Sequence, residues 1–483
     1  MKKEPRTPTF FESLLPVLVL IGLLSLNVVI FGSDATSGAN QMGLLFAAMV
    51  GGLLAMRQGY RWAPLLEGIV KSISSAMPAI LILMLIGSLA GTWLISGIVP
   101  ALIYYGLDIL NPRIFLFAAV VVSAIVSLAT GSSWTTAATV GIALVGIGQA
   151  MGIYEGLVAG AIISGAYFGD KMSPMSDTTN LAPAMAGTDL FTHIRYMTIT
   201  TGPTIGITLL IFLIWGLTFD KGTQMGQIEE VQQAILSRFH ISPVLFLVPL
   251  LVIGMIVKKI PAIPALLTGT ILGAVLAIIY QPDIVLKIAG TTEAGAMAYY
   301  KGVMTAMYTQ TSVATGHPVV DELLSAGGMF GMMNTIWLIL CAMIFGGIME
   351  TNGMLTRLTQ SIIRFAHNTG SLVASTAATC LLVNVTASDQ YISIVVPGRM
   401  FASTFRERGL APENLSRTLE DSGTVTSVLV PWNTCGAYHA SVLGIATGTY
   451  LPYAFFNLIS PLMTVLVAYS GFKIHKLKQE DAA

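Results

Sequence analysis

The stretch from residue 165 to residue 184 concentrates groups that can bind a cation inside an otherwise apolar chain. Its candidate ion- or substrate-binding side chains are Asp177, Thr178, Thr179 and Asn180. Pro174 and Pro183 interrupt backbone hydrogen bonding in the same stretch and free carbonyl oxygens. Carboxylate, amide, hydroxyl and carbonyl oxygens suit hard cations, a preference that we extend to Na⁺ by analogy.

Asp177 is the central carboxylate of this prediction because hydroxyl residues flank it and Asn180 follows three positions later. Burial disfavours the charged form of a carboxylate, whereas a bound cation favours that form. One site would then hold either Na⁺ or H⁺, and that competition produces exchange. The alternative is that Asp177 caps the helix that follows, and the two roles can coexist. Asp170 is a further candidate for proton coupling, with a local ion pair to Lys171 at the membrane edge as the alternative.

A second polar island lies in the other half of the chain. Ser388 and Asp389 separate two apolar runs, and a carboxylate inside a membrane is a functional candidate by default. Asn433 and Thr434 lie in the segment 431–436, which is typical of a discontinuous helix. We expect all four to contribute to ion or substrate binding, and Asp389 to take part in proton coupling.

Other polar residues near these stretches have structural interpretations. Glu420 and Asp421 are interpreted as a helix-start pair near the membrane edge. Asp189 is expected to cap the helix that begins beside it. His439 is interpreted as a packed, hydrogen-bonded histidine, with pH sensing as the alternative.

The two polar islands show a constant spacing that indicates an internal repeat. Thr130 precedes Thr386 by 256 positions, and Ser132 precedes Ser388 by the same number. Paired interrupted helices in the two halves of a membrane protein indicate a secondary transporter with its site between the repeats. Ser132 and Ser133 are therefore expected at a hairpin tip beside the site, and Na⁺ is expected at Asp177, Asn180 and Ser132.

The composition determines which class of protein can position these residues. Only 10% of the 483 residues are charged, against about 25% in a soluble domain. The 24 basic and 24 acidic residues balance, so no charge excess points to nucleic acid. The chain contains no Ser-His-Asp, GxSxG or Walker-type motif, so we expect neither an enzyme nor an ATP-driven pump, and no cofactor other than Na⁺ as the transported or coupling ion.

Apolar runs recur along the whole chain and predict an all-α polytopic membrane protein. Several runs, including 156–169 and 422–430, are short for a span, so we expect 10 to 12 spans plus two re-entrant hairpins. The predicted division is a first transmembrane repeat over 1–217, a polar linker over 218–241, and a second repeat over 242–483 with a cytoplasmic tail. Basic residues near both ends predict that both termini are cytoplasmic.

The run from Ser164 to Pro183, continued by Gly187–Arg195, strongly resembles the NhaC family of bacterial Na⁺/H⁺ antiporters. The segments 131–136 and 431–433 are similar to the same family. The resemblance implies the fold of the ion-transporter superfamily: two inverted repeats, each with a re-entrant helical hairpin and a discontinuous helix, arranged as a scaffold plus a transport domain. It also implies a homodimer in the bacterial inner membrane and elevator-like alternating access.

Three functions follow from these observations. The first is Na⁺/H⁺ antiport, with membrane lipid and a small ion as the partners and no nucleic acid. The alternative is Na⁺- or H⁺-coupled transport of a small organic anion, of the malate/lactate type, or of an amino acid, because related proteins exchange such solutes. A buried Arg would favour this alternative, although Arg399 is interpreted as a membrane-edge residue. The third is a receptor or scaffold without transport, which Asp389 and the broken helices disfavour.

Overall fold

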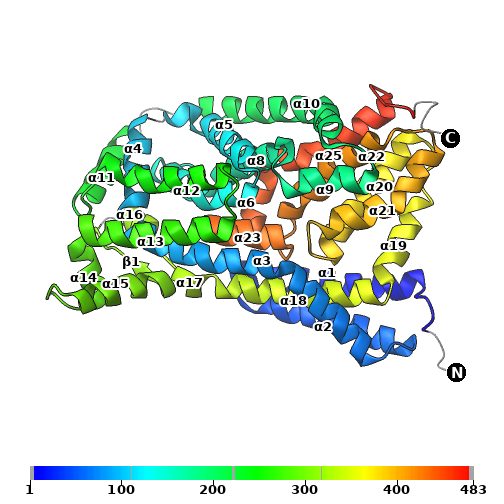
Figure 1. Ribbon diagram of the computed structural model, residues 1–483, viewed down its shortest axis with the longest axis horizontal. Coiled ribbons are helices and arrows are strands. Elements are labelled where there is room, and N and C mark those ends of the chain that lie inside the picture. The colour runs from blue at the N-terminus through cyan, green and yellow to red at the C-terminus, as the bar shows by residue number, and fades with distance from the viewer. Residues whose placement is uncertain (1–4, 110, 220–223, 317, 478–483) are drawn as a thin grey trace.

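The computed structural model describes residues 5–109, 111–219, 224–316 and 318–477, which form an almost entirely helical protein (Figure 1). The prediction of an all-α membrane protein is confirmed at this level. The described strands, β1 (Thr311–Ser312) and β2 (Ser325–Ala326), form one short antiparallel pair. Lys2, Lys3, residues 220–223 of the linker and residues 478–483 of the tail lie outside the described residues.

The first half of the chain forms a long series of helices. Their bounds are α1 (Phe10–Phe31), η1 (Gly32–Ser37), α2 (Ala39–Arg57), α3 (Trp62–Ile95), α4 (Ile98–Ile109), α5 (Pro112–Thr130), α6 (Ser133–Thr136), η2 (Ala137–Gly141), α7 (Ile142–Ala150), α8 (Glu155–Met172), α9 (Asp177–Ala186), α10 (Leu190–Leu217) and α11 (Gln224–Leu236). Of these, η1 is a 3-10 turn and η2 a π-helical turn.

The second half is more often interrupted. Its elements are η3 (Pro243–Phe246), α12 (Leu247–Val257), α13 (Ala262–Tyr280), α14 (Pro282–Ala289), α15 (Ala296–Tyr308), α16 (Pro318–Leu323), α17 (Gly328–Gly331), α18 (Met333–Thr351), α19 (Met354–Ile363), α20 (Thr369–Thr386), α21 (Ile392–Glu407), α22 (Pro412–Leu419), η4 (Glu420–Thr424), η5 (Ser427–Leu429), α23 (Thr434–Leu443), α24 (Thr447–Tyr450), η6 (Leu451–Tyr453) and α25 (Phe455–Ser470). Among them, η4 is a π-helical turn that continues α22.

Eight helices in the described residues are long and apolar enough to cross a membrane, or nine if the bent pair Thr447–Tyr453 and Phe455–Ser470 is one span. The expected 10 to 12 spans are too many by this criterion. The physical reason is that some apolar runs fold as short pieces. The apolar segment Pro243–Val257, for example, forms only the turn η3 and the 11-residue helix α12.

Both halves contain a helical hairpin followed by a broken helix. In the first half, α5 turns into α6 at Gly131, which is left-handed, and α8 breaks before α9. In the second half, α20 turns into α21 at Ser388, which also has a positive φ, and η5 breaks before α23. The residues that precede the two second segments, Ser176 and Asn433, are 257 positions apart. A turn with positive φ between two helices, followed by a break between helical segments, therefore occurs in both halves of the chain.

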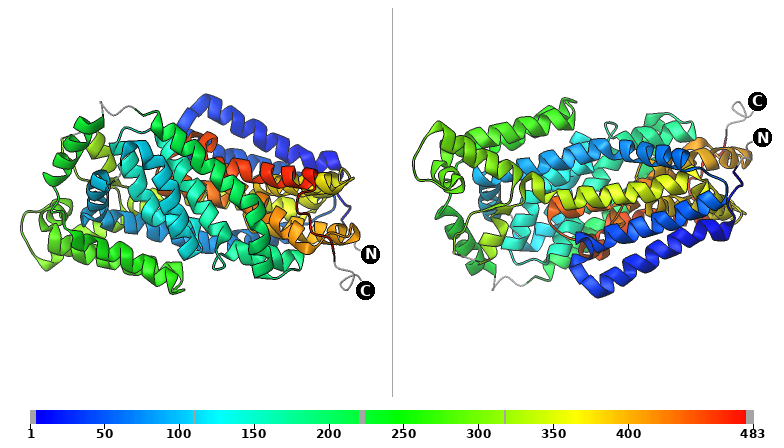
Figure 2. Two further views of the ribbon diagram at one scale, coloured as in Figure 1. Left: turned by 90° about the horizontal axis from the view of Figure 1, so that it is seen from above. Right: turned by 90° about the horizontal axis from the view of Figure 1, so that it is seen from below.

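The two halves interlock in space. Helix α9 packs against α21 and α22, and α23 packs against α6 and η2. Helix α3 lies between α13 and α18 in the lower part of Figure 1, whereas α5, α8, α10 and α25 lie in the upper part. The start of α1 and the end of α25 lie at one end of the molecule, and α11 lies at the opposite end (Figures 1 and 2).

Asp189 performs the capping role expected of it. Its carboxylate accepts a hydrogen bond of 3.0 Å from the backbone N–H of Thr192 in the first turn of α10. Hydrogen bonds from the Thr192 side chain and backbone hold the pKa of Asp189 below its usual range.

The first hairpin tip and the α8–α9 break touch at Gly131. A Cβ atom there would lie 2.7 Å from the backbone carbonyl carbon of Met175, and the residue has φ +70. We expect Gly131→Ala to lower the thermal unfolding temperature, because it adds a backbone clash to about 1–2 kcal/mol of left-handed strain. Gly187→Ala is the matched control, since Gly187 has φ +86 and nothing lies within 4 Å of its Cβ position. An equal fall in unfolding temperature in the two variants would show that Met175 moves away from the added methyl group at no cost in stability.

Candidate functional site

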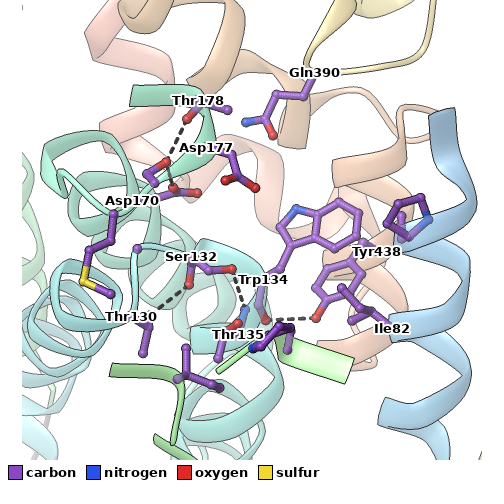
Figure 3. Close-up of a pocket in the computed structure, with 18 of the residues that line it drawn as sticks. Ile82, Thr130, Ser132, Trp134, Thr135, Asp170, Asp177, Thr178, Gln390 and Tyr438 are labelled. Atoms are coloured by element: carbon purple, nitrogen blue, oxygen red, sulfur yellow. Dashed lines mark hydrogen bonds between the residues drawn. The ribbon is translucent and has the colours of Figure 1, made fainter. Parts of the chain in front are cut away.

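A cavity of about 850 Å³ lies where the two hairpin tips meet the two helix breaks. Its wall also includes residues of α3 and of the loop between α12 and α13. Seven of the predicted site residues line it: Ser132, Asp170, Asp177, Thr178, Asn180, Asp389 and Thr434. Residues as far apart in the chain as Ile82 and Tyr438 therefore line one site (Figure 3).

Asp177 is the exposed carboxylate of this cavity. It occupies the first position of α9, and its side chain points toward the space between Gln390 and Trp134 (Figure 3). The residue at the N-cap is Ser176, so the alternative that Asp177 caps the helix as its N-cap is wrong. The helix N-terminus instead stabilises the negative charge of a carboxylate in its first turn.

Ser132 and Asn180 flank the same opening. The Ser132 hydroxyl caps α6 by accepting from the N–H of Thr135 at 3.1 Å. The Asn180 amide nitrogen donates to the carbonyl oxygens of Pro174 and Ser176, at 3.0 and 2.7 Å. With the amide nitrogen held in this way, the amide oxygen is the atom of Asn180 available to a cation.

Asp170 is buried at the cavity wall and is held by hydroxyls. One of its oxygens accepts from the N–H and the hydroxyl of Ser133, at 3.1 and 2.7 Å. The other accepts from the Ser176 hydroxyl at 2.5 Å. Ser133 therefore supports Asp170 instead of lining the cavity, and Thr179 likewise donates to the carbonyl oxygens of Asp170 and Lys171.

The interpretation of Lys171 as a local partner of Asp170 at the membrane edge is wrong. The Lys171 ammonium group pairs with Asp421, 250 positions away, and also donates to the Ser460 hydroxyl at 3.2 Å. The guanidinium of Arg417 lies 4.0 Å from the other oxygen of Asp421. All three side chains are fully buried, so their charges need partners inside the protein. The partner of Lys171 comes from the other half of the chain.

Glu420 and Asp421 were expected near the membrane edge, and the structure corrects this. Both are fully buried in the π-helical turn η4. The two oxygens of Glu420 accept from the hydroxyls of Thr178 and Thr424, at 2.9 and 2.8 Å. Sequence reasoning missed this cluster, although the spacing of Arg417 and Asp421 by four positions is a signal for a helical ion pair.

The second hairpin tip and second break are joined by backbone contacts. Asp389 is buried and accepts from the N–H of Ile392 at 3.0 Å, in a capping geometry at the start of α21. The carbonyl oxygen of Ser388 accepts from the N–H of Thr434 at 3.0 Å. Asn433 caps α23 and donates to Asn384. Asp389 and Thr434 thus line the cavity, while Ser388 and Asn433 hold the segments that carry them.

An aromatic pair connects the two halves at the cavity wall. Trp134 from the first hairpin stacks on Tyr438 of α23, with ring centroids 3.9 Å apart. The Tyr438 hydroxyl donates to the Trp134 carbonyl oxygen at 2.9 Å (Figure 3). His439 packs as expected, with its Nδ1 atom 2.8 Å from the carbonyl oxygen of Cys435. Arg399 is exposed, and the cavity lining does not include it.

Comparisons with known proteins relate this chain to transporters. The profile of a family described as "Na+/H+ antiporter family" matches residues 165–472. The Na⁺/H⁺ antiporter NhaC of Alkalihalophilus pseudofirmus is 39% identical over 90% of this chain and 90% of that protein. The arginine/ornithine antiporter ArcD of Halobacterium salinarum is 36% identical over 99% of this chain and 95% of that protein. The malate-2H⁺/Na⁺-lactate antiporter of Bacillus subtilis is 33% identical over 97% and 96%.

Proposed function

The chain belongs to the Na⁺/H⁺ antiporter family, and from this premise we propose that it exchanges Na⁺ for H⁺ across the bacterial plasma membrane. The observation that carries the proposal is one cavity with three carboxylates, Asp170, Asp177 and Asp389, contributed by both halves of the chain. Lys259 is the basic residue of the described lining, so the cavity has an acidic excess that attracts cations.

In this proposal Na⁺ binds at Asp177, with the oxygens of Ser132 and Asn180 as further ligands. The Thr178 hydroxyl, which also lines the cavity, is within hydrogen-bond distance of both Ser176 and Glu420, so in this proposal it connects the cation site to Glu420. Removal of Na⁺ leaves an uncompensated carboxylate, which favours protonation, and a bound Na⁺ favours proton release. Asp389 and Asp170 contribute to this coupling from the same cavity. Competition between the two cations then links their movements in opposite directions.

We further propose that the two halves are inverted repeats and that the site moves by an elevator-like mechanism. The first half begins at one end of the molecule and ends, with α11, at the other, which supports opposite orientation of the halves (Figure 1). The cavity lies between α3 and the α12–α13 loop on one side and the hairpins and broken helices on the other. We assign the former to a scaffold, the latter to a transport domain, and the scaffold to the homodimer contact. Both termini are assigned to the cytoplasm, with α11 on the opposite side.

The cavity volume supports transport of an organic solute as a second candidate function. A space of about 850 Å³ is in the range of sites for small organic molecules, and two relatives are named for arginine and ornithine or for malate and lactate. The buried Arg417 does not favour an organic anion here, because it faces Asp421 and does not line the cavity. The acidic lining favours a cationic or zwitterionic solute over a dicarboxylate.

Transport by purified protein in proteoliposomes tests these functions. Vesicles that enclose a pH-sensitive dye are expected to change internal pH when Na⁺ is added, in proportion to the amount of protein. The same vesicles are then given radiolabelled arginine, ornithine, malate and lactate. Accumulation of a solute without any Na⁺-dependent pH change would overturn Na⁺/H⁺ exchange in favour of the second candidate.

A further inference from the structure

Four oxygen atoms form an unbroken row from the cavity wall into the buried interface between the two broken helices. The Oδ1 atom of Asp170 lies 2.5 Å from Ser176 Oγ, which lies 3.1 Å from Thr178 Oγ1. The Oγ1 atom of Thr178 lies 2.9 Å from Oε1 of Glu420. Asp170 lines the cavity, and Glu420 is fully buried.

Counting hydrogens along this row shows that it is one proton short. Three oxygen–oxygen contacts require three hydrogens, and the two hydroxyl groups supply two. If both carboxylates were ionised, one contact would bring two lone pairs together without a hydrogen between them. One additional proton, carried by either carboxylate, satisfies all three contacts and aligns every hydrogen bond in one direction.

We propose that Asp170 and Glu420 share one proton through Ser176 and Thr178, and that Glu420 is the inner group that holds the transported proton. This inference rests on the proposed coupling of cation and proton transport and adds to it the place where the proton resides. Glu420 is not among the residues predicted from the sequence to couple proton transport, which are Asp177, Asp389 and Asp170.

The groups around the row favour Glu420 as the resting place. Ser133 donates two further hydrogen bonds to Asp170, and these favour its ionised form. The second oxygen of Glu420 receives one hydrogen bond, from Thr424. The titratable groups around Glu420 are Asp170 and Lys171 of α8 and Cys380 of α20, while Arg417 and Asp421 lie within three positions of it in the chain.

Charge balance leads to the same assignment. The buried cluster contains two cations, Lys171 and Arg417, and three acids, Asp170, Glu420 and Asp421. Both cations are directed to Asp421. Unbalanced charge in a low-dielectric interior is unfavourable, so the cluster is neutral when it holds one proton.

The transfer itself conserves every proton. Protonated Glu420 donates to Thr178 Oγ1 as the Thr178 hydroxyl proton passes to Ser176 Oγ. The Ser176 hydroxyl proton passes to Asp170, which becomes neutral while Glu420 becomes an anion. Asp170 can then release the proton to water in the cavity, and uptake reverses the sequence.

The test uses full-length protein in proteoliposomes and measures proton and sodium fluxes separately. Glu420→Gln keeps the shape of the side chain but has no exchangeable carboxyl proton. We expect it to lower Na⁺-driven proton flux about 100-fold or more, the size of effect typical of a lost acid–base group, while exchange of ²²Na⁺ for Na⁺ persists. Glu407→Gln, at an exposed position at the end of α21, is the matched control and is expected to leave both fluxes unchanged.

A second pair of variants tests the row itself if Glu420→Gln does not fold. Thr178→Val removes the connecting hydroxyl and should reproduce the selective loss of proton flux, whereas Thr178→Ser should restore it. Wild-type proton flux in both Glu420→Gln and Thr178→Val would overturn the inference and leave the proposed exchange intact. If the wild type instead couples protons to an organic solute, the same variants are compared on that proton flux, and wild-type protein that moves no protons overturns both proposals.

Discussion

Replacing Asp177 with Asn is expected to lower the apparent affinity for Na⁺ about 100-fold and so to suppress exchange at low millimolar Na⁺. Two unit charges about 4 Å apart attract each other by roughly 4 kcal/mol at an effective dielectric constant of about 20. Loss of about 3 kcal/mol of that attraction corresponds to a factor of about 100 in the dissociation constant. Asp177 is exposed to the cavity, so the substitution leaves no buried group without a partner.

The measurement is the Na⁺ dependence of the internal pH change in proteoliposomes at several pH values. Asp283→Asn is a matched control, because Asp283 is also an exposed aspartate in the first turn of a helix, α14, and does not line the cavity. Unchanged Na⁺ affinity together with an unchanged pH profile in Asp177→Asn would exclude Asp177 from the cation site.

The largest expected effect on stability is at Asp421, which is the counterion of two buried cations. Asp421→Asn leaves Lys171 and Arg417 without an anion and is expected to cost about 3–5 kcal/mol or more. Lys171→Met should cost less, because Asp421 keeps Arg417 at 4.0 Å. The double variant should be no less stable than Asp421→Asn alone, since it removes one of the two orphaned cations.

Unfolding of the detergent-solubilised protein by increasing denaturant measures this order. Lys301→Met, at an exposed position on α15, is the matched control for loss of a lysine and is expected to change stability by less than about 0.5 kcal/mol. If Lys171→Met destabilised the protein more than Asp421→Asn, Asp421 would not be the shared counterion.

The residues at the hairpin tips and breaks could be predicted because polar groups are conspicuous in an apolar chain. Ser132, Asp177 and Asp389 stand out for this reason, and all three line the cavity. Pro174 lies in the break between α8 and α9, as expected, whereas Pro183 lies inside the continuous helix α9 and does not break it. Each of these features is determined by residues that are close together in the chain, so it can be predicted from the sequence alone.

The buried cluster could not be predicted because its partners are distant in the chain. Lys171 follows Asp170 directly, so a local pair was the simplest interpretation, yet its partner is Asp421. Glu420 shows no neighbouring feature that distinguishes a buried acid from one at a membrane edge. Only the packing of α9 against α22 and η4 brings Thr178 to it. The described residues contain fewer candidate spans than predicted for a related reason, since apolar composition does not determine how long a helix will be.

The Lys171–Asp421 pair also has a consequence for biosynthesis. When the ribosome has completed α8, the partner of Lys171 has not yet been translated, and 250 residues must still be added. An unpaired lysine is unfavourable by about 2.5–3.5 kcal/mol at the centre of a membrane-inserted helix, and by less in the last turn of a helix, where Lys171 lies. The segment α8–α9 is therefore expected to stay near the translocon, or in contact with an insertion factor, until η4 emerges with Asp421. Premature termination before η4 would leave a membrane-inserted fragment that quality-control proteases can recognise by its unpaired charge.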